Sequence, residues 1–265
     1  MTAPLPIAQL SQSAADWREL RWLLTDVDDT LTWQGALPWQ TLQALSQLRD
    51  AGIRVVPVTG ACAGWCDHIA NAWPVDAVIG ENGAFVMQRQ NGTLNSTINH
   101  TAQQAQAALL AFVQTLLSQY PARRIASDQA YRVAEVAIDI GQHTPAAPKD
   151  EIRALLDALH AYGASATASS IHINAWVGDH SKKVSSFRYL AEQGLSGKQY
   201  SEQVAFIGDS LNDSQMFASF PLSVGVANIA HHLPSLPHPP QWITTQPGGF
   251  GFAEFAHQLL TLKRQ

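Results

Sequence analysis

The stretch RWLLTDVDDT, residues 21–30, decides the fold, because a short apolar run passes directly into three aspartates. A short apolar run bounded by polar residues is typical of a strand that is buried on both faces of a parallel sheet. Two further runs, Ile53–Val58 and Val204–Ile207, end in the same way, at Thr59-Gly60 and at Gly208-Asp209. Stretches with helical spacing separate the runs, and this alternation predicts a parallel sheet with right-handed crossovers. We therefore expect an α/β fold with a three-layer, Rossmann-like core.

The pattern changes after the first strands. Asn91-Gly92 between two short β-type runs predicts a hairpin with a tight primed turn. Val133–Ile140 and Ile171–Val177 alternate as half-buried strands do, and two stretches with helical spacing accompany them. These features predict a small α+β cap inserted into the core. The expected boundaries are a cap at 87–178 and a catalytic core made of 1–86 and 179–265.

Composition restricts the classes of partner. The 265 residues are 46% apolar, which supplies a buried core and excludes an intrinsically disordered chain. The formal charge of -5 argues against the basic face that binds nucleic acid. No apolar stretch approaches the roughly 20 residues that cross a bilayer, and the N-terminus, with a short helix expected near residues 14–20, does not resemble a signal peptide. We expect a soluble, cytoplasmic protein without nucleic-acid or membrane partners. Its two cysteines, Cys62 and Cys66, are expected to be buried thiols. The sequence leaves its oligomeric state open.

Polar side chains gather where the predicted parallel strands end. The carboxyl ends of such strands face one crevice, which is where ligands bind in α/β sheets. Several acidic residues follow the strands there, with Thr59 after another strand and a lysine pair at the start of a later helix; the acids are Asp26, Asp28, Asp209 and Asp213. Carboxylates that converge cannot all stay ionised without a counter-charge, and Mg²⁺ is the usual cation where phosphate is the other ligand. The cluster therefore suits phosphoryl transfer.

These residues resemble the motifs of the haloacid dehalogenase-like (HAD) phosphatases. Asp26-Val27-Asp28-Asp29-Thr30 is similar to the DxDxT motif, Thr59 to the second motif, and the segment 208–213 to GDxxND. Glu81-Asn82-Gly83, Val226-Ala227-Asn228 and the late Pro247-Gly248-Gly249 resemble the Cof-type branch, subfamily IIB. That branch includes phosphatases of sucrose phosphate and mannosyl-3-phosphoglycerate. The resemblance implies a Mg²⁺-dependent phosphatase for a small phosphorylated metabolite, most simply a sugar phosphate.

The resemblance also implies roles for individual residues. Asp26 would be the nucleophile that forms an aspartyl-phosphate, and Asp28 the acid that protonates the leaving oxygen and then activates water. Asp28 would also reach the metal through its backbone carbonyl. The remaining expected contacts are metal ligation by Asp26, Asp209 and Asp213, and phosphate binding by Thr59, Gly60, Lys183 and Asn212.

Two features depart from the family pattern or leave it ambiguous. The second motif often reads Thr-Gly-Arg in this branch, whereas this chain has Ala61 in the third place, so a cation is missing. The phosphate lysine could be Lys182 or Lys183. Helical spacing favours Lys183, because Phe187 and Leu190 then follow on the same face.

The strand Ile171–Val177 holds the candidates for substrate selection. Alternation places His172, Asn174 and Trp176 on one face, which is either a solvated surface or a polar lining above the crevice. Two other functions remain open from the sequence. A phosphomutase would use the same aspartates but retain the phosphate, and a binding protein without activity would not need both Asp26 and Asp28.

Overall fold

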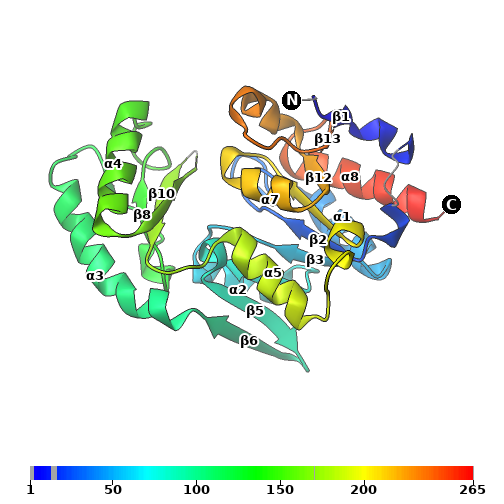
Figure 1. Cartoon of the computed structure of the whole chain (residues 1–265), viewed down its shortest axis with the longest axis horizontal. Helices are drawn as coiled ribbons and strands as arrows, with labels where there is room; N and C mark the ends of the chain where they lie inside the picture. The colour runs from blue at the N-terminus through cyan, green and yellow to red at the C-terminus, as the bar shows by residue number, and fades with distance from the viewer. Residues whose placement is uncertain (1–2, 13–16, 170, 265) are drawn as a thin grey trace.

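The structure, a computed structural model, describes residues 3–12, 17–169 and 171–264 and is built around a six-stranded parallel sheet (Figure 1). The strands lie in the order β1-β13-β12-β11-β2-β3, so β2 and β11 are central neighbours. Their bounds are β1 Leu5–Pro6, β2 Trp22–Thr25, β3 Arg54–Pro57, β11 Val204–Gly208, β12 Leu222–Gly225 and β13 Trp242–Ile243.

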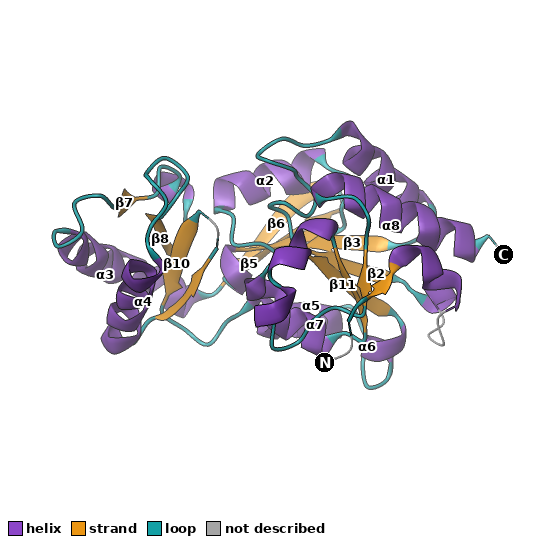
Figure 2. Ribbon diagram, turned by 90° about the horizontal axis from the view of Figure 1, so that it is seen from above, coloured by secondary structure: helices purple, strands orange, loops and turns teal. Residues whose placement is uncertain are grey.

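Helices cover both faces of this sheet, as Figure 2 shows. One apolar cluster joins Leu23 of β2 to helices α1, α2 and α8, and a second joins Leu24 to α5 and α7. Successive residues of β2 therefore face two different cores, which explains why its whole run is apolar. The predicted three-layer α/β core is confirmed. The helices are α1 Trp39–Asp50, α2 Ala63–Ala72, α5 Lys182–Glu192, α6 Gln199–Glu202, α7 Ser214–Ser219 and α8 Gly248–Lys263.

A three-stranded antiparallel sheet, β4-β5-β6, extends the core beyond β3. Its first strand meets the end of β3 through a parallel bridge between Val58 and Ile79. Asn91 and Gly92 both have positive φ, 51° and 82°, which is the backbone of the predicted primed hairpin turn. Residue 87, where the sequence predicts the cap to begin, lies inside β5, and the domain boundaries stay a prediction. The bounds are β4 Ala77–Gly80, β5 Phe85–Gln90 and β6 Thr93–Ile98.

An antiparallel sheet in the order β7-β8-β10-β9 forms the body of the inserted cap. Helices α3 and α4 pack on one face of it with an apolar cluster of their own, which includes Leu109 and Val113 of α3. The opposite face turns towards the ends of the parallel strands, where Asn174 of β10 contacts Gly60. The α+β insertion is thus confirmed. Its elements are α3 His100–Leu117, β7 Arg124–Ile125, β8 Val136–Asp139, α4 Lys149–Tyr162, β9 Ser165–Ala168 and β10 His172–Trp176.

The helices test two further expectations, on a membrane-spanning segment and on the helix near residues 14–20. None of the helices among the described residues is long and apolar enough to cross a membrane. Of the short helix expected near residues 14–20, Trp17–Glu19 form a single 3₁₀ turn, and residues 14–16 lie outside the described part of the chain.

Candidate active site at the ends of the parallel strands

Three aspartates meet where the central strands end. Asp26 follows β2 and Asp209 follows β11, and the amide of Asp26 donates to the carbonyl of Ile207 at 2.9 Å. Asp213 closes the 3₁₀ turn Leu211–Asp213, which Ser210 separates from Asp209. One carboxylate oxygen from each of the three lies within 4.8 Å of the others. The adjacency of two strands thus brings together acids that are far apart in the sequence.

The lysine at this cluster is Lys182, and this corrects the preference for Lys183. The ammonium of Lys182 lies 2.5 Å from Asp26 Oδ1 and 3.0 Å from Asp213 Oδ1, and its side chain is buried. Lys183 is exposed. The spacing of Phe187 and Leu190 was misleading because the buried face of α5 also contains two serines, Ser185 and Ser186, while Phe187 is only half-buried.

The cluster is short of positive charge. Three carboxylates share one ammonium, and little water reaches them. Burial raises the pKa of Asp26 to about 7, with the charge of Asp213 adding to the effect of burial. Burial and the charges of Asp26 and Asp213 likewise raise the pKa of Asp209. A cation with a preference for oxygen ligands would relieve this imbalance.

Backbone and amide donors hold two of the aspartates in place. Asn228 Nδ2 donates to Asp209 Oδ2 at 2.9 Å, and the amides of Asp209 and Ser210 donate to Asp213 Oδ2 at 3.1 and 3.3 Å. A Cβ atom at Gly208 would lie only 2.5 Å from Asp213 Oδ2. Glycine is therefore required there for the close approach of the carboxylate to the backbone.

Asp28 lies apart from the three clustered carboxylates. The residue as a whole is exposed. Its pKa is nonetheless raised, mainly because surrounding protein atoms displace water from the carboxyl group, with a further contribution from the charge of Asp29. A raised pKa suits a group that must carry a proton to a leaving oxygen. Its metal contact through the backbone carbonyl stays a prediction.

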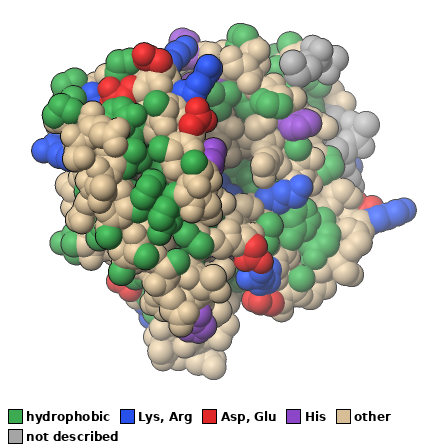
Figure 3. Space-filling model, turned by 60° about the vertical axis from the view of Figure 1, so that its left-hand side comes forward, with side chains coloured by type: hydrophobic (Ala, Val, Ile, Leu, Met, Phe, Trp, Pro, Cys, Tyr) green, Lys and Arg blue, Asp and Glu red, His purple; other side chains and the backbone are tan. Residues whose placement is uncertain are grey.

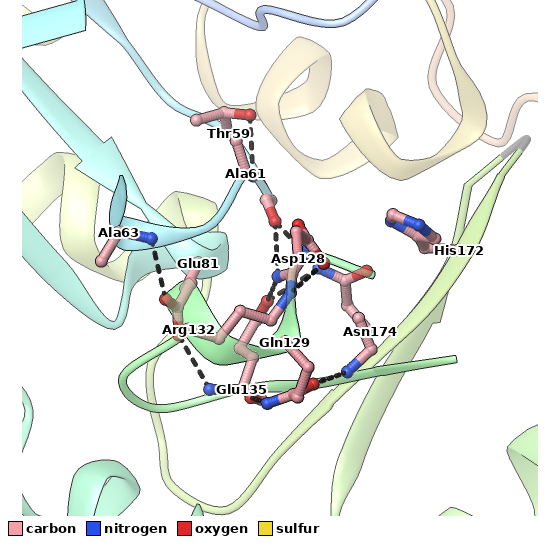
Figure 4. A network of polar contacts seen from close by, with 12 residues as sticks. Thr59, Ala61, Ala63, Glu81, Asp128, Gln129, Arg132, Glu135, His172 and Asn174 are labelled. Atoms are coloured by element: carbon pink, nitrogen blue, oxygen red, sulfur yellow. Dashed lines mark hydrogen bonds and ion pairs between the residues drawn. The ribbon is translucent and has the colours of Figure 1, made fainter. Parts of the chain in front are cut away.

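The turn Thr59-Gly60-Ala61 follows β3 and receives a cation from the cap (Figure 4). Thr59 Oγ1 accepts a hydrogen bond from the amide of Ala61 at 3.0 Å. The carbonyl of Gly60 accepts from the Arg132 guanidinium at 2.9 Å and from Asn174 Nδ2 at 3.0 Å. Although Ala61 offers no charge, an arginine from the cap thus reaches the same turn.

Glu81 ties the core to the same segment of the cap. Its fully buried carboxylate accepts hydrogen bonds from four backbone amides, those of Ala63, Val133, Ala134 and Glu135, at 2.8 to 3.3 Å. Glu81 and Asn82 both have positive φ, 43° and 50°, which is unusual for two successive residues other than glycine. Such a backbone persists only where surrounding contacts determine it. Here the contacts are those that join cap to core.

Glu135 is the second buried acid of this junction. Its carboxylate accepts from Asn82 Nδ2 and Asn174 Nδ2, both at 2.8 Å, and lies 3.3 Å from Arg132. Burial raises the pKa of Glu135 to about 8. Arg132 also pairs with Asp128 at 2.8 Å, and its side chain is 1% exposed. The junction is therefore a dry network in which every member depends on its partners.

The cap strand β10 presents its polar face to the core. His172, Asn174 and Trp176 are each at most 7% exposed, which excludes a solvated face. Asn174 reaches Gly60, as described, and Trp176 Nε1 donates to the carbonyl of His180 at 3.1 Å. His172 Nε2 is buried without a hydrogen-bond partner among the described residues. That the three residues select the substrate stays a prediction.

A cavity of about 380 Å³ lies between the cap and the core. Lys182 lies on its wall, so the cavity adjoins the aspartate cluster. Asn212, which also accepts from Ser210 Oγ at 2.7 Å, contributes to the wall from the core, and Trp176 contributes from the cap. Figure 3 shows a hollow near the centre of one face of the molecule, with Lys, Arg and His side chains and also Asp and Glu side chains beside it. The volume suits a small ligand.

Several residues of the site have no role that the sequence patterns indicate. Arg132 and Glu135 belong to no motif, and Glu81, Asn82 and Asn228 are part of the family resemblance alone. The sequence shows that the arginine of the second motif is missing at position 61. Nothing in the spacing of the chain indicates which arginine contacts this turn instead, because Arg132 reaches Gly60 across 72 residues.

Comparisons with known proteins agree with this geometry. Residues 23–131 match the family model described as haloacid dehalogenase-like hydrolase, whereas no curated protein sequence matches the chain. A protein of Thermoplasma acidophilum, 0175, is similar in structure with a TM-score of 0.73 and 16% identity, over 91% of this chain and 98% of its own. A HAD/Cof-like hydrolase from Plasmodium vivax has a TM-score of 0.69 and 16% identity, over 96% and 99% of the two chains.

A third similar structure carries a ligand. The sucrose-phosphatase of Synechocystis sp. PCC6803, solved with sucrose and phosphate, has a TM-score of 0.63 and 17% identity, over 90% of this chain and 97% of its own. Identities this low compare folds alone, and they agree with the parallel core and inserted cap described above. The family match over residues 23–131 makes this chain similar to the haloacid dehalogenase-like hydrolases, and its fold agrees with that similarity.

Proposed function

We propose that the protein is a Mg²⁺-dependent phosphatase that hydrolyses a small phosphorylated metabolite, a sugar phosphate, through an aspartyl-phosphate. The observation that carries this proposal is the cluster at the strand ends. There a buried lysine contacts Asp26 and Asp213, and with Asp209 three carboxylates share this single positive charge. The cavity beside Lys182 supports a small substrate, and the similar fold of a sucrose-phosphatase supports a sugar as its leaving group.

The donor set fits Mg²⁺. Asp26, Asp209 and Asp213 offer only oxygen ligands within a small space, and the backbone carbonyl of Asp28 would add another. Hard divalent cations are bound by such groups, and no sulfur or imidazole ligand belongs to the cluster. When bound, the ion would supply the positive charge that a phosphate ester needs at this site.

Each chemical step of the proposed reaction can be assigned to a residue of the site. A carboxylate oxygen of Asp26 attacks phosphorus, the bond from phosphorus to the sugar oxygen breaks, and Asp28 gives its proton to that oxygen. Asp28 next takes a proton from water, whose oxygen attacks the phosphorus of the aspartyl-phosphate, and the bond between phosphorus and the Asp26 oxygen breaks. Inorganic phosphate leaves, and Asp26 and the protonated Asp28 are regenerated.

Other residues hold the phosphoryl group. The charge of Lys182 favours the ionised form of Asp26, and its ammonium would also bind the phosphate oxygens. Thr59 and the Gly60 turn, fixed from behind by Arg132 and Asn174, would bind those oxygens from the side of β3. Asn212 would bind them from the cavity wall.

Release of inorganic phosphate from a panel of phosphorylated sugars tests this function. Purified protein should release phosphate with Mg²⁺ present, and a chelator should abolish the release reversibly. Asp26→Asn should lower turnover by about 10³-fold, equivalent to about 4 kcal/mol. Asp50→Asn, an exposed aspartate on α1, is the matched control and should not change turnover. Near-native turnover by Asp26→Asn would refute the proposal, and transfer of phosphate within the sugar without release would identify a mutase.

A further inference from the structure

The wall of the cavity between cap and core carries positive charge and no acid. Lys182, Lys183 and His160 lie on it, together with the amides of Asn212 and Gln215 and the ring of Trp176. No aspartate or glutamate belongs to the wall in the part of the chain that the structure describes. The region beyond the aspartate cluster therefore favours an anion.

The ammonium groups of the two lysines on this wall lie in different surroundings. Lys182 is buried against Asp26 and Asp213, so its charge is already balanced. Adjacent residues of a helix point about 100° apart, so Lys183 cannot reach the same two carboxylates. Its side chain is exposed, and no carboxylate of the described residues lies within 4.0 Å of its ammonium. Because Lys183 lines the cavity, its charge is available to a ligand there.

The start of α5 strengthens the positive potential at this place. Ser181, Lys182 and Lys183 all line the cavity, so the N-terminus of this 11-residue helix opens onto it. The aligned peptide dipoles place a partial positive charge at that end. His160, exposed at the end of α4, faces the cavity from the cap. An anionic group between the two sides would therefore meet donors from both core and cap.

We propose that the leaving group of the natural substrate carries a second anionic group, a carboxylate or a further phosphate, which Lys183 binds. The inference rests on the proposed phosphatase function, because Lys182 and the aspartate cluster are taken to hold the phosphate that is cleaved. The uncharged part of the leaving group would then lie between the amides of the core wall and Trp176. A phosphorylated sugar acid or a sugar bisphosphate has this chemistry, whereas a singly phosphorylated neutral sugar has not.

Three matched substrates test this inference. Glucose 6-phosphate is neutral beyond its phosphate, 6-phosphogluconate adds a carboxylate, and fructose 1,6-bisphosphate adds a phosphate. We expect kcat/KM to be about tenfold higher for at least one of the acidic substrates than for glucose 6-phosphate, equivalent to about 1.4 kcal/mol. Lys183→Gln should abolish this ratio through KM, and Lys183→Arg should preserve it. Lys198→Gln, an exposed lysine of the core away from the cavity, is the control and should leave the ratio intact.

A binding measurement separates this inference from the proposed function. Calorimetry with Asp26→Asn protein should show that 6-phosphogluconate or fructose 1,6-bisphosphate binds more tightly than glucose 6-phosphate, and that adding Lys183→Gln removes the difference. Equal affinities, or a preference that survives Lys183→Gln, would overturn the inference even if phosphatase activity is found. Conversely, a Lys183-dependent preference in binding without phosphate release by the native protein would retain the inference about the ligand and reject the proposed function.

Discussion

Replacing Arg132 with alanine should weaken the fold and disable the site together. The substitution removes the donor at 2.9 Å from Gly60 and the pairs with Asp128 at 2.8 Å and Glu135 at 3.3 Å. Because the guanidinium is 1% exposed, water cannot replace the hydrogen bonds that its partners would lose. Breaking a buried ion pair by removing one partner costs about 3–5 kcal/mol. For a chain of this size that loss corresponds to a fall in Tm of roughly 10 °C.

Activity should fall with any substrate. In the proposed mechanism the Gly60 turn binds the phosphoryl group, which every phosphate ester has, so displacement of the turn should not distinguish between leaving groups. A shift of about 1 Å can lower a rate about 10²-fold. We therefore expect kcat/KM to fall by about that factor both for the best sugar phosphate and for p-nitrophenyl phosphate. Thermal unfolding followed by circular dichroism and a phosphate-release assay measure the two effects.

Two further variants separate positioning from stability. Arg153→Ala removes an exposed arginine from α4 of the same cap and should change neither Tm nor kcat/KM. Arg132→Met combined with Glu135→Gln replaces both members of the buried contact by uncharged side chains, so it should recover part of the lost stability without recovering activity. A Tm for Arg132→Ala within about 2 °C of the native value, or kcat/KM that returns together with stability in the double variant, would refute the reasoning.

Three other outcomes follow from the site. Lys182→Met should abolish turnover of every substrate, because Asp26, Asp213 and the bound phosphate would all lose the charge of the ammonium; native activity in phosphate release would contradict this. Glu135 has a pKa of about 8 in the folded protein, so it keeps its proton at pH values where the unfolded chain loses it. The free energy of unfolding should therefore fall as the pH rises from about 4.5 to 8. Urea unfolding at several pH values should show a weaker dependence of this free energy on pH for Glu135→Gln. Gly208→Ala should reduce both stability and metal affinity, because the new Cβ would lie 2.5 Å from Asp213 Oδ2, and unchanged calorimetric Mg²⁺ binding would count against it.

The sequence predicted what depends on local pattern. The apolar run before Asp26 is buried on both faces, and strands in this arrangement necessarily bring Asp26 and Asp209 to one edge of the sheet. Asn91-Gly92 forms its hairpin because both residues tolerate positive φ. In each case the residues that decide the structure are neighbours in the chain or repeat with its period.

The remainder depends on packing that no spacing encodes. On α5 the buried face carries Ser185 and Ser186 as well as Leu190. Hydrophobic spacing therefore predicted Lys183 as the lysine of the site, whereas Lys182 contacts the aspartates in the structure. The contact between Arg132 and Gly60 joins cap to core, and only the docking of the cap determines it. Residues of this kind lie at the junction of two packing units, which is where sequence periodicity carries least information.

The phosphorylated form of Asp26 is the most direct test of the proposed mechanism. Asp28→Asn protein should still accept a phosphoryl group from p-nitrophenyl phosphate with Mg²⁺, because p-nitrophenolate leaves without a proton, but it should hydrolyse the intermediate slowly for want of a base. Mass spectrometry after acid quenching should then find one phosphoryl group on the peptide that contains Asp26, and none when Asp26→Asn is added. A phosphoryl group on another residue, or p-nitrophenol release by the double variant at the rate of Asp28→Asn, would contradict the account.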